Sequence, residues 1–188
     1  KLGKSIFTNL TLWTLLSEQE FVYVGDEGIV EPSGRSLRRG VEFNIRYQPM
    51  DWFTVSYDVN ITNARSLDSE SFENRIPLAP SHLQTGSINI LPFKNLSVAA
   101  HYRFMGDRPA KEDNSIIAQG YSIWDANISY TFKKVQFIME CRNLLNVEWN
   151  ETQFATESRL KNESESVEEI HFTPGTPRAF YFSTKVNF

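Results

Sequence analysis

The chain has 188 residues, of which 40% are hydrophobic, 22% charged and 13% aromatic, and its formal net charge is −4. This composition excludes a disordered chain, and the acidic balance excludes nucleic acid as a partner, because phosphate binding needs a concentrated basic surface. A single cysteine excludes an internal disulfide framework, and three scattered histidines form no zinc motif. No catalytic constellation or phosphate-binding loop is present, so we expect no enzyme activity, no cofactor and no bound metal.

Apolar residues recur at every second position through most of the chain. In residues 36–49, Val41, Phe43 and Ile45 share one face, and polar residues stand between them. A period of two residues is typical of a β-strand with unlike faces. The pattern predicts about eight strands, at residues 5–16, 36–49, 53–63, 83–91, 96–104, 121–132, 135–142 and 180–188. The polar face of this sheet would carry Glu42, Arg46, Asp58, Arg103, Asp125, Glu140 and Arg142.

The length of these segments favours strands that cross a membrane. They run to 8–14 residues, around the 9–11 or so that a tilted strand needs to cross the hydrocarbon layer, whereas strands of soluble proteins average about 5 or 6. The mean hydropathy of −0.38 and the lack of an apolar run near 18 residues exclude a transmembrane helix but not such strands. Aromatic residues near the strand ends would form interfacial girdles: Trp52, Phe53, Phe93, Phe132, Tyr102, Phe104, Tyr121 and Trp124.

The connections between the predicted strands alternate in length. Short connections near residues 48–51, 91–95 and 131–134 separate long ones at residues 17–35, 64–81, 106–119 and 146–176. Outer-membrane barrels have this arrangement, with short turns on the periplasmic side and long loops outside. Within the first long connection, residues 20–24 are expected to extend the first strand beyond the membrane.

Several groups of residues resemble, in order and spacing, the closing strands of TonB-dependent outer-membrane receptors. They are Arg38 to Glu42, Ile76 to His82, Gly120 to Asn127, Arg142-Asn143-Leu144-Leu145-Asn146 and Pro174-Gly175-Thr176-Pro177-Arg178. The ending resembles the signal by which such barrels are recognised for membrane assembly, with a terminal aromatic residue and apolar residues at alternate positions. That signal would consist of Phe180, Phe182, Val186 and Phe188.

The resemblance implies an all-β fold, an antiparallel transmembrane β-barrel of the 22-stranded type. Residues 1–188 would be about eight C-terminal strands of that barrel, and the plug domain of such receptors would be absent from this chain. It implies import of a scarce ligand, such as a siderophore, cobalamin or a saccharide, across the bacterial outer membrane. The partners would be outer-membrane lipid, the protein's own N-terminal plug and remaining barrel strands, TonB and the barrel assembly machinery. The ligand-binding residues stay unknown.

Two other architectures also fit parts of the pattern. A complete eight-stranded barrel with a structural or adhesive role fits the length, and it would require the strand containing Ile6 to pair with the strand containing Phe182. A soluble β-sandwich that serves as a binding module fits the composition, because a half-buried sheet also alternates.

Overall fold

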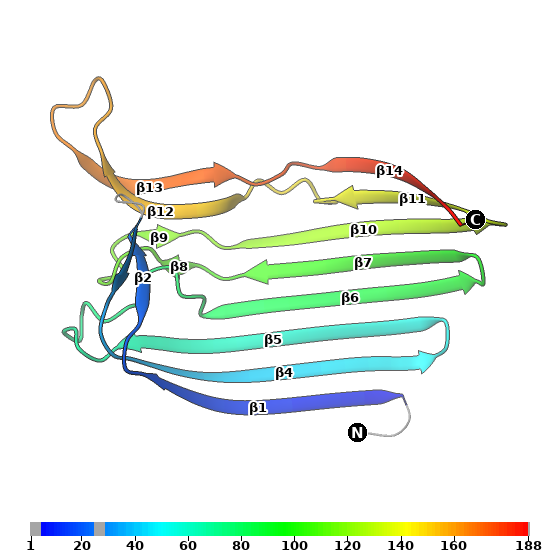
Figure 1. The fold of residues 1–188 in the computed structure, drawn as a ribbon, viewed down its shortest axis with the longest axis horizontal. Helices are drawn as coiled ribbons and strands as arrows, with labels where there is room; N and C mark the ends of the chain where they lie inside the picture. Colours follow the sequence, from blue (N-terminus) through cyan, green and yellow to red (C-terminus); the bar gives the residue numbers. More distant parts are fainter. Residues whose placement is uncertain (1–4, 25–28, 188) are drawn as a thin grey trace.

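A computed structural model describes residues 5–24 and 29–187 of the chain, and all regular structure in these residues is β (Figure 1). Eight long strands form one antiparallel sheet in the order β1-β4-β5-β6-β7-β10-β11-β14. Their bounds are β1 (Ile6–Ser17), β4 (Ser36–Met50), β5 (Phe53–Ser66), β6 (His82–Phe93), β7 (Leu96–Met105), β10 (Tyr121–Phe132), β11 (Val135–Arg142) and β14 (Ala179–Val186). These are the eight strands that the sequence predicts, although Phe188 lies outside the described residues.

The register of the sheet aligns the apolar faces of neighbouring strands. Ile128 on β10 lies opposite both Val98 on β7 and Met139 on β11, and Met139 in turn lies opposite Phe182 on β14. Residues directly opposite each other in an antiparallel pair project to the same side. One side of the sheet is therefore predominantly apolar across its width, and most polar residues of the strands lie on the reverse.

This apolar side is uncovered. The chain exposes 12719 Å² to solvent, whereas a globular protein of 21.7 kDa exposes about 9,200 Å². Leu12 and Phe182 are 74% and 75% exposed, and no second sheet packs against the eight-stranded layer within the described residues. A soluble β-sandwich would bury these side chains, so the structure does not have that architecture.

The sheet is open at both edges. Strands β1 and β14 are its outermost members, and they do not pair with each other in residues 5–24 and 29–187. A complete eight-stranded barrel would require that pairing, so these residues do not form one. Free strand edges are unsatisfied in lipid, because the hydrocarbon offers no hydrogen-bond partner.

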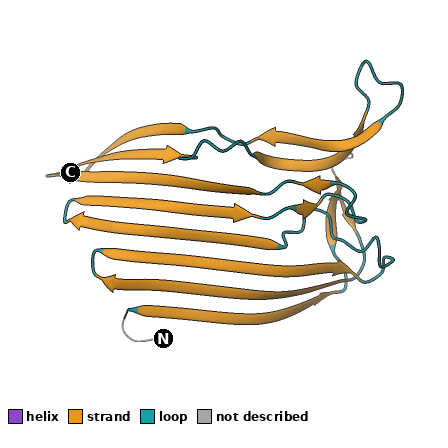
Figure 2. Ribbon diagram, turned by 180° about the vertical axis from the view of Figure 1, so that it is seen from behind, coloured by secondary structure: helices purple, strands orange, loops and turns teal. Residues whose placement is uncertain are grey.

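Short and long connections alternate at opposite ends of the sheet (Figure 2). Two residues join the strands at 51–52, 94–95 and 133–134, while residues 18–35, 67–81, 106–120 and 143–178 make the long connections. Three of the long connections carry short strands: β2 (Phe21–Val24) with β3 (Ile29–Pro32), β8 (Arg108–Pro109) with β9 (Ile117–Ala118), and β12 (Asn150–Ser158) with β13 (Val167–Pro174). No helix in the described residues is long and apolar enough to cross a membrane.

The prediction that residues 20–24 extend the first strand is wrong. Strand β1 ends at Ser17, and β2 forms a separate hairpin with β3. The base of this hairpin is closed by hydrogen bonds between the backbones of Glu20 and Gly34 (2.7 Å) and of Ser33 and Glu20 (2.8 Å). Gly34 has a φ of 83°, a conformation that glycine adopts without steric cost, and it turns the chain back toward β4.

Candidate functional site

The polar side of the sheet carries a ladder of hydrogen-bonded side chains across β1, β4 and β5. The Asn44 amide donates to Asp58 (2.6 Å), and the Asn60 amide donates to Glu42 (3.1 Å). The register places all seven charged residues of the predicted polar face on this side: Glu42, Arg46, Asp58, Arg103, Asp125, Glu140 and Arg142. In a barrel with the apolar side outward, this ladder faces the lumen.

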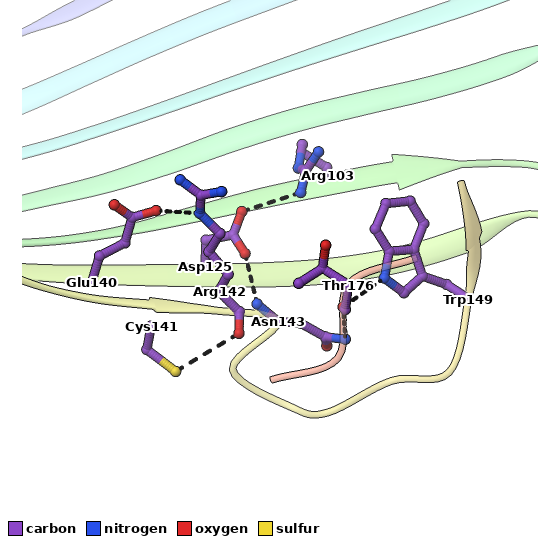
Figure 3. Close-up of polar contacts among 8 residues, drawn as sticks. All are labelled: Arg103, Asp125, Glu140, Cys141, Arg142, Asn143, Trp149 and Thr176. Carbon is purple, nitrogen blue, oxygen red and sulfur yellow. Dashed lines mark hydrogen bonds and ion pairs between the residues drawn. The ribbon is translucent and has the colours of Figure 1, made fainter. Parts of the chain in front are cut away.

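A second polar cluster joins β7, β10 and β11 where the strands meet the long connections (Figure 3). One Asp125 carboxylate oxygen accepts from the Arg103 guanidinium (3.3 Å), and the other accepts from the backbone N–H of Asn143 (2.8 Å). Beside it, Arg142 donates to Glu140 (2.6 Å). Asp125 therefore links the wall of the sheet to the start of the longest connection.

Asn143 fixes the base of that connection. Its side chain is buried, with 2% of the residue exposed, and it donates to the carbonyls of Val147 (2.8 Å) and Thr176 (3.2 Å) while its oxygen accepts from the N–H of Val147 (2.8 Å). Its φ of 49° lies in the left-handed region, which asparagine tolerates better than most residues. One side chain thus holds both ends of the loop, and we call Asp125, Asn143, Val147 and Thr176 the clasp.

Trp149 and Gly175 complete the closure beside the clasp. The Trp149 indole N–H donates to the Thr176 carbonyl (3.1 Å), and the Gly175 N–H donates to the Trp149 carbonyl (2.8 Å). The indole lies so close that a Cβ on Gly175 would stand 2.0 Å from Trp149 Cε2. Three groups of residues that the sequence singled out separately, around Asp125, Asn143 and Gly175, therefore meet in one place.

Ion pairs hold the other long connections. The Glu20 carboxylate accepts from Ser36 (2.5 Å) and Arg38 (2.9 Å), and it ties the β2–β3 hairpin to β4. Burial raises the pKa of Glu20, but these two hydrogen bonds outweigh it, so the pKa lies below its ordinary value. Hydrogen bonds from Arg35 to Asp68 likewise hold the pKa of Asp68 low.

Contacts between different long connections could not be predicted from the sequence. The Gln153 amide, 3% exposed, exchanges two hydrogen bonds with the backbone of Gln119 (2.9 and 2.8 Å). Lys111 also pairs with Glu168 on β13 (2.5 Å). Neither contact has a sequence signal, because its members are 34 and 57 residues apart in loops without a regular pattern.

The arrangement offers hydrogen-bonding and ionic surface rather than a reaction centre. Within residues 5–24 and 29–187, no group of three or more His, Cys, Asp or Glu side chains is placed to hold a metal ion. Of the predicted assembly signal, Phe180, Phe182 and Val186 lie on the apolar side of β14, an edge strand of the sheet. The remaining member, Phe188, is outside the described part.

Solved structures of outer-membrane receptors share this arrangement. The ferric-catecholate import receptor Fiu of E. coli K12 superposes with a TM-score of 0.73 and 19% identity over 100% of this chain and 26% of its own. The siderophore receptor PiuA of Acinetobacter baumannii has a TM-score of 0.70 and 14% identity over 98% of this chain and 26% of its own. The copper transporter OprC has a TM-score of 0.71 and 14% identity over 99% of this chain and 30% of its own. No protein-family model and no curated protein sequence matches the chain.

The chain spans only about a quarter to a third of the length of these receptors. They are TonB-dependent receptors of the bacterial outer membrane, and the described residues of this chain are all-β and antiparallel, as in a section of such a barrel. The open edges of the sheet accord with that partial coverage, since a section of a larger barrel has two neighbours in the wall. The chain has the fold of a section of the barrel of a TonB-dependent outer-membrane receptor.

Proposed function

We propose that the chain is the C-terminal section of the barrel of a TonB-dependent receptor, which imports a scarce ligand across the bacterial outer membrane. The observation that carries this proposal is the predominantly apolar, uncovered side of a one-layer sheet with two open edges. In water that side would expose large apolar side chains, whereas in lipid it would be solvated by the acyl chains.

In this role the chain builds part of the wall and several outer loops. The charged ladder around Glu42, Asn44 and Asp58 would face the protein's plug. The clasp would hold the base of the longest loop over the lumen. The plug and the segment that contacts TonB would belong to parts of the protein outside this chain. Transport would then require those parts, and the chain would contribute its walls, its loops and its contacts with lipid.

The class of ligand stays wider than one compound. Two of the matched structures are named as receptors, for ferric catecholate and for a siderophore, and the third as a copper transporter, so a metal or its chelate is the class of ligand that these neighbours favour. Glu42, Asp58 and Asn60 lie on the polar side of β4 and β5, where side-chain amides donate hydrogen bonds to both carboxylates. Such a surface suits a hydrophilic ligand in transit better than an apolar one.

The C-terminal residues would also mark the protein for the barrel assembly machinery. Phe180, Phe182 and Val186 alternate along the edge strand β14, where an assembling partner strand could pair with them. Deletion of Phe188 from the complete receptor should therefore lower the amount of folded protein in the outer membrane. Wild-type amounts after the deletion, measured by heat-modifiable mobility in gels, would show that this residue does not serve as the signal.

A probe confined to lipid tests the proposed orientation. In the complete receptor placed in phosphatidylcholine vesicles, a photoactivated acyl-chain probe should label Phe43, Val59 and Phe137. It should spare Asp58 and Arg142, which lie on the other side of the same strands. Labelling of the charged set with sparing of the apolar set would overturn the proposal.

A further inference from the structure

Three arginines extend the lipid-facing side of the sheet at the end that carries the long loops. Arg39 on β4 lies opposite Asn63, on the parity of Val41 and Phe43, and Arg65 continues that parity on β5. The backbone of Arg75 forms a bridge directly opposite Arg65. Because paired residues project to the same side of a sheet, all three side chains belong to the outward face.

Their height on the barrel is that of the lipid headgroups. Twelve residues separate Arg65 from Phe53, which begins β5 at the short-turn end, and they span about 40 Å along the strand. A strand tilted by about 40° rises about 30 Å over that length, which exceeds the roughly 25 Å of the apolar band. The arginines therefore stand just beyond the hydrocarbon, where phosphate groups of lipids lie.

The positive charge of this cluster is uncompensated. Among the described residues, no carboxylate lies within ion-pair distance of Arg39, Arg65 or Arg75. The Arg65 guanidinium has one neutral acceptor, the side-chain oxygen of Asn74, at 3.3 Å. Like charges directly opposite each other in a sheet are destabilising, so an anion shared by Arg65 and Arg75 would relieve their repulsion.

We propose that Arg39, Arg65 and Arg75 form a binding site for the phosphate groups of an anionic lipid in the leaflet nearest the long loops. Directly opposite residues have Cβ atoms about 5 Å apart and diagonal ones about 7–8 Å, so three guanidinium groups can converge on one headgroup. Guanidinium is the side chain that binds phosphate with two parallel hydrogen bonds. The arginine cluster adjoins the apolar side of the sheet, so a lipid fits better than a soluble anion. The lipid headgroup can bind the arginines while its acyl chains cover the apolar side chains.

The test uses the complete receptor in nanodiscs of phosphatidylcholine with 10% phosphatidic acid, and it measures phosphatidic acid co-purified after extraction with detergent. A cation near an anionic membrane surface strengthens binding about fivefold, so R39Q/R65Q/R75Q should bind phosphatidic acid about 100-fold more weakly. R39K/R65K/R75K keeps the charge but loses the paired hydrogen bonds of guanidinium, so its binding should lie between that of wild type and that of R39Q/R65Q/R75Q. The control R159Q/K161Q removes two positive charges from an exposed part of the longest loop and should behave as wild type.

Equal retention of phosphatidic acid by R39Q/R65Q/R75Q and wild type would overturn the inference. Displacement of the lipid by 20 mM inorganic phosphate would also overturn it, because that result would indicate a site for a soluble anion. If the triple variant does not fold, R39Q alone decides, because Arg39 is exposed and its loss should weaken binding about fivefold. The inference rests on the proposed membrane placement. A receptor that does not enter nanodiscs of either composition would refute that placement and this site together, whereas entry without enrichment of phosphatidic acid would refute this site alone.

Discussion

Replacing Asn143 by alanine should open the base of the longest outer loop while leaving the barrel wall intact. The side chain makes three hydrogen bonds with the backbone of Val147 and Thr176, and it is buried. Each such bond contributes about 1 kcal/mol net, and the left-handed backbone conformation costs alanine about 1 kcal/mol more. The local opening free energy should therefore fall by about 4 kcal/mol.

Hydrogen exchange followed by mass spectrometry on the complete receptor measures this local opening. Since 1.4 kcal/mol corresponds to a factor of ten, the amides of residues 144–149 and of Gly175, Thr176 and Arg178 should exchange nearly three orders of magnitude faster in N143A. Amides in the middle of β10 should keep their wild-type rates, because the register of the wall does not depend on the side chain of Asn143.

Two variants separate the causes. N143G loses the same hydrogen bonds but accepts the positive φ, so its loss should be about 1 kcal/mol smaller than that of N143A. N162A, at an exposed asparagine in the same loop, should exchange as wild type does. Exchange in N143A within threefold of wild type, or an N143G more destabilised than N143A, would refute the assignment of the clasp.

Three further substitutions test other parts of the structure. G175A should lower the opening free energy of the loop base by about 1–3 kcal/mol, because the new Cβ would overlap the Trp149 ring and displace it. Faster hydrogen exchange at Thr176 and Arg178 should report this change. I128R on the lipid side of β10 should lower the free energy of unfolding in vesicles by about 2–4 kcal/mol, as measured by urea titration. Glu20 has a lowered pKa in the folded state, so its stabilisation of the β2–β3 hairpin is complete above its ordinary value of 4.5. That stabilisation should disappear as the pH falls through the folded-state pKa, and proteolysis of the hairpin should rise accordingly.

Each of these substitutions has a control in the same chain. G106A places a Cβ 3.4 Å from the nearest atom, an ordinary contact, and should leave exchange near wild type. S129R carries the same charge as I128R but on the lumen side, so it should cost much less. E20Q has no charge to lose, and proteolysis of its hairpin should not change between pH 6 and pH 3. Equal effects in a variant and its control would contradict the corresponding argument.

The long strands were predictable because one physical requirement acts on all of them. Lipid selects an apolar side chain at every second position, and the two-residue turns then fix the register of each hairpin. The segment of β6 alternates less cleanly, since Gln84 falls on the lipid side. There the Tyr57 hydroxyl donates to the Gln84 side chain, so a polar group is satisfied within the lipid-facing surface.

The hairpins of the loops were not predictable in the same way. The run from Phe21 to Val24 is continuously apolar, and such a run is compatible with a strand extension or with a separate hairpin. Gly34 and the backbone hydrogen bonds of Glu20 decide between them, and both act through contacts that the sequence does not display. Likewise, Asp125 lies 18 residues and Thr176 33 residues from Asn143, so their proximity follows only from the order of the strands.

The same contrast explains why the strands of the sheet could be predicted from the sequence and the ligand could not. Every strand meets the same solvent, and eight repetitions of one rule produce a pattern that few other folds share. Each long connection meets its own neighbours, and a contact such as that between Gln119 and Gln153 satisfies a requirement that occurs once. Loop residues such as Asn143 reveal themselves only where a backbone conformation restricts the choice of residue. Under the proposed function, selectivity for a ligand would depend on loop contacts that each occur once and leave no pattern in the sequence. It therefore has to be measured on the complete receptor.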